Sequence, residues 1–126
     1  MNLLLDTHIL IWYLEGHPNL SEKHRSIIED RRNLVAVSTA SLWEMTIKIS
    51  IGKLELIDGF AAIEATLLLQ GIRILPIQTA HLQRLLSLPF HHRDPFDRLI
   101  IAQALDEDMT LVSDDEFFPL YPVSLA

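Results

Sequence analysis

The 126 residues are enough for one domain with a buried core, and we assign residues 1–126 to one domain. A composition of 49% hydrophobic and 21% charged residues excludes a disordered chain. The absence of cysteine excludes a disulfide framework and thiolate metal sites, and the net charge of −7 argues against a protein that coats nucleic acid. An acidic chain still suits an enzyme that meets phosphate through carboxylate-held metal ions, or a protein with a basic partner.

The chain opens with a short apolar run, residues 1–5, which ends in the carboxylate of Asp6. An uncharged run of this length predicts a central strand of a parallel sheet that is covered on both faces. The run is too short for a membrane span and lacks the basic residues of a signal peptide, so we expect a soluble, cytoplasmic protein. Ligands of open α/β sheets bind beyond the carboxyl ends of the strands, which puts Asp6 at the mouth of a candidate site.

A buried helix begins at Thr7, and helices then alternate with short apolar strands. Further helices are predicted over residues 21–32, 39–51, 58–70, 79–86 and 96–106. Strands are predicted over residues 34–37, 72–75 and 110–112, and residues 122–125 can add a short strand. This α/β alternation predicts a parallel sheet of four to five strands with helices on both faces.

Three further acids can reach the same edge of the sheet as Asp6. Asp115 follows a predicted strand, Glu44 lies on the helix after another strand, and Asp97 lies in the first turn of a helix. Two carboxylates ~4 Å apart repel by ~4 kcal/mol at an effective dielectric near 20, so a converging cluster needs a proton or a cation. Oxygen ligands without Cys or His in the set favour Mg²⁺ or Mn²⁺, a combination that suits phosphodiester hydrolysis.

Taken singly, each acid also has a purely structural interpretation. Asp6 or Asp97 can belong to a helix cap, and Glu44 stands at capping-box spacing after Ser41. Asp115 can lie in a solvated turn. These interpretations remain open from the residues alone.

Four motifs run through the chain. They are Leu4-Leu5-Asp6-Thr7-His8, Ser41-Leu42-Trp43-Glu44, His92-Arg93-Asp94-Pro95-Phe96-Asp97-Arg98 and Leu111-Val112-Ser113-Asp114-Asp115. In this order and spacing they resemble PIN-domain ribonucleases, in particular the VapC-type toxins of bacterial toxin–antitoxin pairs. The resemblance covers nearly the whole chain.

The resemblance implies a three-layer α/β/α sandwich, one or two Mg²⁺ or Mn²⁺ ions, and metal-dependent cleavage of RNA. The family's acids match Asp6, Glu44 and Asp97, and the fourth matches Asp115, although the adjacent Asp114 leaves that position open by one residue. The resemblance also implies a homodimer and a VapB-like antitoxin whose segment blocks the active site.

We hypothesise that Asp6 and Asp97 ligate the catalytic metal directly, while Glu44 and Asp115 bind through water or hold a second ion. Metal-activated water would attack phosphorus and leave a 5′-phosphate and a 3′-hydroxyl.

Other residues are expected to assist these acids. Hydroxyls or carboxylates beside the ligands can orient them or water, and the candidates are Thr7, Ser113 and Asp114. Basic or imidazole groups can meet RNA phosphate, and the candidates are His92, Arg93, Arg98 and Lys53. The tryptophans, Trp12 and Trp43, are expected in the core.

Two alternative functions remain open from the sequence. The first is a Mg²⁺-dependent phosphohydrolase, but His8 stands where that class carries the second acid of an Asp-x-Asp pair on its first strand. The second is a catalytically inactive PIN-like protein-interaction module, which the presence of all the acids disfavours.

Overall fold

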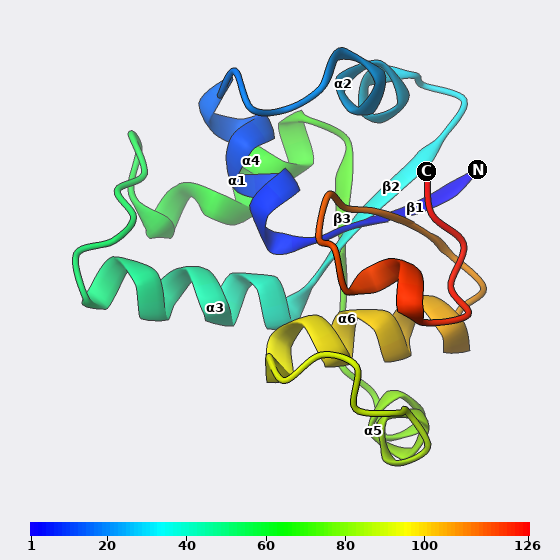
Figure 1. Cartoon of the computed structure of the whole chain (residues 1–126). Coiled ribbons are helices and arrows are strands. Elements are labelled where there is room, and N and C mark those ends of the chain that lie inside the picture. Colours follow the sequence, from blue (N-terminus) through cyan, green and yellow to red (C-terminus); the bar gives the residue numbers. More distant parts are fainter.

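The structure is a computed structural model that describes residues 1–126. It contains a parallel sheet with the strand order β3-β2-β1-β4 (Figure 1). The strands are β1 (Asn2–Leu5), β2 (Leu34–Ser38), β3 (Ile72–Leu75) and β4 (Thr110–Val112). The helices are α1 (Thr7–Glu15), α2 (Glu22–Glu29), α3 (Thr39–Ser50), α4 (Ile63–Leu69), α5 (Thr79–Leu86) and α6 (Pro95–Asp106), with short 3-10 turns η1 (Phe60–Ala62) and η2 (Phe118–Leu120). The predicted α/β fold with a four-stranded parallel sheet is confirmed. No helix combines the length and the hydropathy that a membrane span needs.

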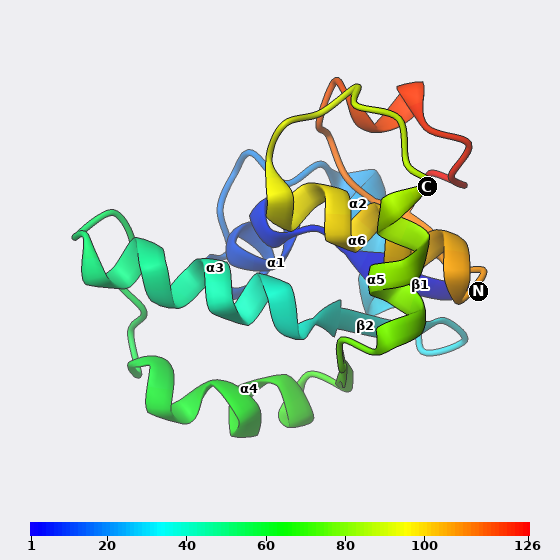
Figure 2. The same ribbon diagram turned by 90° about the horizontal axis from the view of Figure 1, so that it is seen from below.

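The side chains of β1 alternate between two hydrophobic cores, one on each face of the sheet. Leu3 and Leu5 lie in the core that α1, α2 and α4 cover, and Leu4 lies in the core that α6 covers. Figure 1 shows α1, α2 and α4 above the sheet and α5 and α6 below it, and the view from below shows α6 between α5 and the sheet (Figure 2). The architecture is therefore three layers, α/β/α.

The strand register brings the carboxyl ends of three strands level with one another. Leu5 pairs with Val37 on one side and with Val112 on the other. The next residues, Asp6 and Ser113, are therefore neighbours across the sheet edge, and Asp6 N donates to Val112 O over 3.1 Å. This edge is where a ligand site is expected in an open parallel sheet.

Two predicted helices differ at their ends from the observed ones. The helix predicted over residues 58–70 begins at Ile63, because Gly59 has a left-handed backbone (φ +74°) and a 3-10 turn follows it. The helix predicted over residues 21–32 ends at Glu29. There Asp30 turns extended and accepts both the backbone N–H and the guanidinium of Arg32, a local turn that replaces the last helical turn.

Two further expectations need correction. The tail forms no fifth strand but a single bridge, in which Leu111 N donates to Ser124 O and Ala126 N donates to Leu111 O. Trp43 is not a core residue: it is 59% exposed and packs edge-on against Phe96, with the ring centroids 5.0 Å apart. Trp12 is half-buried and packs against the hydrophobic core that contains Leu3 and Leu5.

Candidate functional site

Asp6 both caps a helix and belongs to the candidate site, because its two carboxylate oxygens have different partners. Oδ1 caps α1 by accepting the backbone N–H of Ile9 over 2.8 Å. Oδ2 accepts a short hydrogen bond from the hydroxyl of Ser113. The residue is only 3% exposed, so this carboxylate is held rigidly at the end of β1.

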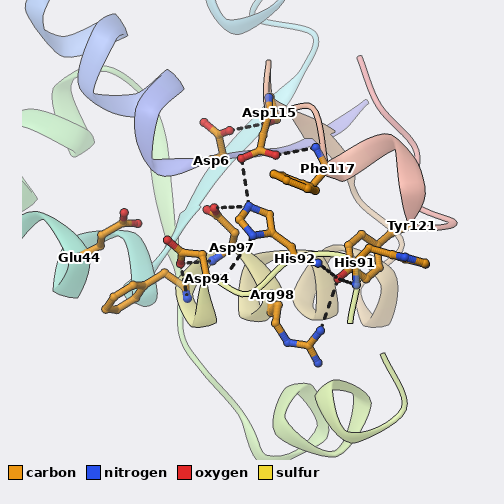
Figure 3. Close-up of polar contacts among 12 residues, drawn as sticks. Asp6, Glu44, His91, His92, Asp94, Asp97, Arg98, Asp115, Phe117 and Tyr121 are labelled. Carbon is orange, nitrogen blue, oxygen red and sulfur yellow. Dashed lines mark hydrogen bonds and ion pairs between the residues drawn. The ribbon is translucent and has the colours of Figure 1, made fainter. Parts of the chain in front are cut away.

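Ser113 links Asp6 to Asp115 at the end of β4. Its hydroxyl oxygen accepts the backbone N–H of Asp115 over 3.0 Å while the hydroxyl donates to Asp6. Asp115 in turn accepts the backbone N–H of Phe117 with Oδ1, which leaves Oδ2 directed toward Asp97 and His92 (Figure 3). Asp114 points elsewhere: its half-exposed carboxylate lies 3.5 Å from His24 Nδ1. Of the two adjacent acids, Asp115 is the one in the cluster.

Asp97 projects from the first turn of α6, whose cap is Asp94 rather than Asp97. Asp94 Oδ1 accepts the backbone N–H groups of Phe96 and Asp97, at 2.8 and 3.2 Å, so the Asp97 side chain is free of capping. Pro95 at the first helical position fixes the entry of the helix. Asp97 is 8% exposed and faces Asp115 across His92.

Glu44 lies inside α3, six residues after the cap, which is Ser38 and not Ser41. It stands apart from the other acids in Figure 3, on the far side of Asp97 from Asp115. Its Oε2 lies 3.6 Å from Lys48 Nζ, whereas Oε1 is buried without any hydrogen-bond partner. A buried carboxylate oxygen with no donor is costly, and a cation or an ordered water would relieve it.

The electrostatics of the cluster favour protonated acids in the absence of a cation. Burial, followed by the negative charges of Asp94, Glu44, Asp6 and Asp115, raises the pKa of Asp97 to about 8. Burial also raises the pKa of Asp6, although the hydrogen bonds from Ser113 and from the Ile9 N–H oppose it. The cluster therefore carries more carboxyl groups than it can ionise together near neutral pH.

His92 is the residue whose contacts the sequence did not predict. Its Nε2 lies 3.0 Å from Asp97 Oδ2 and 3.1 Å from Asp115 Oδ2, between the two carboxylates (Figure 3). We expected it to meet RNA phosphate, but the ring is only 12% exposed and packs against Phe117. The ring of the adjacent His91 packs against Tyr121 instead, with the ring centroids 5.1 Å apart. The nearest sequence signal is the His-x-Asp spacing of His92 and Asp94, since the backbone N–H of Asp94 donates to the ring.

Two more residues have roles other than those expected. The Thr7 hydroxyl donates to Ser41 Oγ over 3.0 Å and so joins α1 to α3, without contact to an acid. Arg98 does not reach the surface: its guanidinium donates to the carbonyls of Pro89 and Leu88 and lies 4.0 Å from the centroid of the Phe90 ring. In this structure the guanidinium of Arg98 is buried and its hydrogen bonds go to backbone carbonyls, so it is not presented to an RNA phosphate.

Arg93 and Lys53 remain accessible cations. Both are exposed, Arg93 in the loop before α6 and Lys53 just after α3. Figure 1 shows that the end of α3 lies away from the sheet, whereas Arg93 directly follows His92, whose ring contacts Asp97 and Asp115.

The residues of the cluster fit a divalent cation. All of the carboxylate ligands that the acids offer are hard oxygens, and one of them, Glu44 Oε1, is buried without a hydrogen-bond partner. The negative charges around Asp97 would also be relieved by a cation. The second group of potential ligands in the molecule, His81 with Asp106 and Glu107, does not fit. His81 Nδ1 accepts the Gln78 N–H over 3.0 Å, so its Nε2 carries the proton and donates to Glu107 over 2.9 Å.

The fold is similar to that of several solved structures. VapBC2 from Rickettsia felis, bound to a DNA fragment from its promoter, aligns with a TM-score of 0.74 at 20% identity over 100% of this chain and 98% of that one. A toxin–antitoxin complex from Klebsiella pneumoniae aligns with a TM-score of 0.65 at 19% identity over 98% and 95% of the two chains. VapC20 of Mycobacterium tuberculosis, a toxin that cleaves the sarcin–ricin loop, aligns with a TM-score of 0.60 at 16% identity over 96% and 95%.

Sequence comparison gives the family directly. No curated protein matches the chain significantly. The family model for the PIN domain, in contrast, matches residues 3–122, which include every acid of the cluster. The chain therefore belongs to the PIN domain family.

Proposed function

We propose that this protein is a metal-dependent endoribonuclease, formed by one domain over residues 1–126, that acts as the toxin of a toxin–antitoxin pair. The observation that carries the proposal is the convergence of Asp6, Asp97 and Asp115 at one sheet edge, with Glu44 on the other side of Asp97 and close enough for its charge to raise the pKa of Asp97. Membership of the PIN domain family and the likeness of the fold to toxin–antitoxin complexes support it.

Mg²⁺ or Mn²⁺, as one or two ions, would be held directly by Asp6 and Asp97, with Glu44 and Asp115 binding through water or a second ion. When bound, such an ion lowers the pKa of a water ligand and neutralises the scissile phosphate. The protein's own part is to fix the ligands. Ser113 orients Asp6, and the cap that Asp94 provides leaves Asp97 free to project.

The substrate we propose is RNA. Support comes from the family and from the structural likeness to a toxin that cleaves the sarcin–ricin loop. Arg93, exposed in the loop before α6, is the cation best placed to meet a phosphate, because Lys53 lies beyond the far end of α3 and Arg98 is buried. This activity would place the protein in the cytoplasm.

The partners we propose are a VapB-like antitoxin and a second copy of the chain. Large apolar side chains on the helices remain exposed, and a protein partner would cover them. Examples are Trp43 on α3 (59% exposed), Leu68 and Leu69 on α4 (80% and 87%) and Leu86 on α5 (80%). Light scattering of the purified protein, alone and with the product of a neighbouring gene, would measure both associations.

The decisive experiment is incubation of purified protein with total cellular RNA in Mn²⁺ or Mg²⁺, beside Asp97→Asn and an EDTA control. Discrete fragments with 5′-phosphate ends that disappear in both controls are expected. Fragments that persist with Asp97→Asn would contradict the proposed site.

Assays of phosphomonoester hydrolysis and of Mn²⁺ binding, beside this experiment, separate the alternatives. A phosphohydrolase would release inorganic phosphate from a monoester and leave RNA intact. An inactive interaction module would bind its partner protein but neither cleave RNA nor bind Mn²⁺.

A further inference from the structure

His92 is held in place from its backbone and from one side of its ring. The backbone N–H groups of His91 and His92 both donate to Tyr121 Oη, at 3.1 and 2.9 Å, and Tyr121 Oη donates to Pro89 O over 2.9 Å. The ring packs against Phe117, with the centroids 4.8 Å apart. The loop before α6 therefore presents this imidazole to the acids in one orientation.

The hydrogen bonds of the ring define its tautomer. Asp94 N donates to His92 Nδ1 over 3.2 Å, so Nδ1 must offer a lone pair and carries no proton. The proton of the imidazole is then on Nε2, which donates to Asp115 Oδ2 over 3.1 Å and lies 3.0 Å from Asp97 Oδ2. A nitrogen that bears a proton has no lone pair for a metal ion.

This N–H lies where a cation between Asp97 and Asp115 would lie. His92 Nε2 lies 3.0 Å from Asp97 Oδ2 and 3.1 Å from Asp115 Oδ2, so an ion that took these two oxygens as ligands would compete with the N–H for them. The imidazole N–H and a divalent cation would each relieve the same repulsion, and they would exclude each other.

We propose that His92 is a positioning residue that holds Asp97 and Asp115 together through its Nε2–H, and that its ring leaves these carboxylates when a divalent cation binds them. This inference rests on the metal site of the proposed function. It assigns His92 as a competitor of the metal and not as one of its ligands.

Affinity for Mn²⁺, measured by electron paramagnetic resonance of the free ion, distinguishes a competitor from a ligand. His92→Ala removes the competing N–H, so we expect Mn²⁺ to bind roughly 3- to 10-fold more tightly than to the wild type, the factor that one protein hydrogen bond represents. The matched control is His91→Ala, whose side chain faces Tyr121 and not the acids and which should leave the affinity unchanged. Weaker binding by His92→Ala would make His92 a ligand, and unchanged binding would remove the competition; either result would overturn the proposal.

A second measurement needs no substitution. Nitrogen-15 NMR of the imidazoles in EDTA should show His92 with a protonated Nε2 and an unprotonated Nδ1. His81 has the same tautomer, but its polar partners are Gln78, Gln103, Asp106 and Glu107 and none of the acids of the cluster, so it serves as an internal reference. Addition of Mg²⁺ should shift the His92 signals and leave those of His81 unchanged.

The outcomes separate this inference from the proposed function. A protonated Nδ1 at His92 in EDTA would overturn the inference while leaving the metal site intact. Failure of the wild type and of both variants to bind Mn²⁺ would instead overturn the metal site itself, and with it the exchange of the ring for an ion.

Discussion

Ser113 donates its hydroxyl proton to Oδ2 of Asp6, so the first residue after β4 fixes the acid that follows β1. The contact follows from the strand register, in which Leu5 pairs with Val112. Asp6 is buried, and its Oδ1 accepts the backbone N–H of Ile9 in the cap of α1. Ser113 is therefore the side chain that orients Oδ2, the oxygen that does not take part in the cap.

Ser113→Ala should therefore destabilise the protein in EDTA by about 1–3 kcal/mol, the cost of leaving a buried carboxylate oxygen without its donor. Ser113→Thr keeps the hydroxyl and should cost much less. Urea unfolding of the three proteins measures this difference. Equal stability of wild type and Ser113→Ala would show that the hydroxyl does not support Asp6.

Asp97→Asn should raise the stability of the metal-free protein, because it removes one of the charges that crowd Asp94, Glu44, Asp6 and Asp115. The gain should depend on pH. The pKa of Asp97 is about 8 in the folded protein against 3.8 in the unfolded chain, so the folded state binds the extra proton between these values. The contribution of Asp97 to stability is then full below pH 4 and is lost as the pH rises toward 8.

Thermal unfolding in EDTA at pH 5 and pH 8 tests this sign. The fall in Tm between the two pH values should be smaller for Asp97→Asn than for the wild type. A larger fall in the variant would mean that Asp97 is ionised throughout this range and that the cluster is less crowded than its geometry implies.

Much of the site could be predicted because it depends on strand ends. A short apolar run closed by an acid predicts the position of Asp6, and the same pattern before Asp115 places it at the same edge. The carboxyl ends of neighbouring parallel strands lie at one edge of the sheet, so acids that directly follow such strands can be predicted to lie close together.

The contacts of His92 and Arg98 could not be predicted, since they depend on the path of an irregular loop. That path is fixed by Tyr121, which accepts N–H groups 29 and 30 residues earlier in the chain, a separation that no local pattern reveals. Arg98 looks like a surface cation in the sequence, but its guanidinium donates to the backbone carbonyls of Pro89 and Leu88. The helix near residue 60 was misplaced because helical spacing cannot show the left-handed turn at Gly59.

Asp115 and Asp114 offer a direct test of which acid belongs to the site. Asp115→Asn should weaken Mn²⁺ binding and abolish RNA cleavage, since its Oδ2 lies in the cluster. Asp114→Asn should change neither by more than about twofold, because its carboxylate is half-exposed and lies beside His24. Cleavage that survives Asp115→Asn but not Asp114→Asn would reverse the assignment of the fourth acid.

Metal binding should release protons, because Asp97 is protonated near neutral pH in the metal-free protein. The apparent affinity for Mg²⁺ should rise as the pH increases toward 8. Calorimetric titration in two buffers of different ionisation enthalpy counts the protons released at pH 7. Binding without proton release would indicate that the ion does not use Asp97.

Substitutions of Arg98, within α6, and of Arg93, in the loop before it, distinguish a structural role from an RNA-binding role. Arg98→Ala should cost about 2–4 kcal/mol of stability, because it removes the guanidinium donor of Leu88 O, one of the two donors of Pro89 O, and the cation packed on Phe90. Arg98→Lys should recover only part of this loss, since an ammonium lacks the planar fork that reaches both carbonyls. Arg93→Ala, at an exposed position, should leave urea unfolding unchanged and weaken RNA binding, with a shallower dependence on salt. If Arg98→Ala unfolds like the wild type and loses RNA binding instead, the guanidinium must leave its buried site in the complex, and Arg98 would return to the RNA-binding surface.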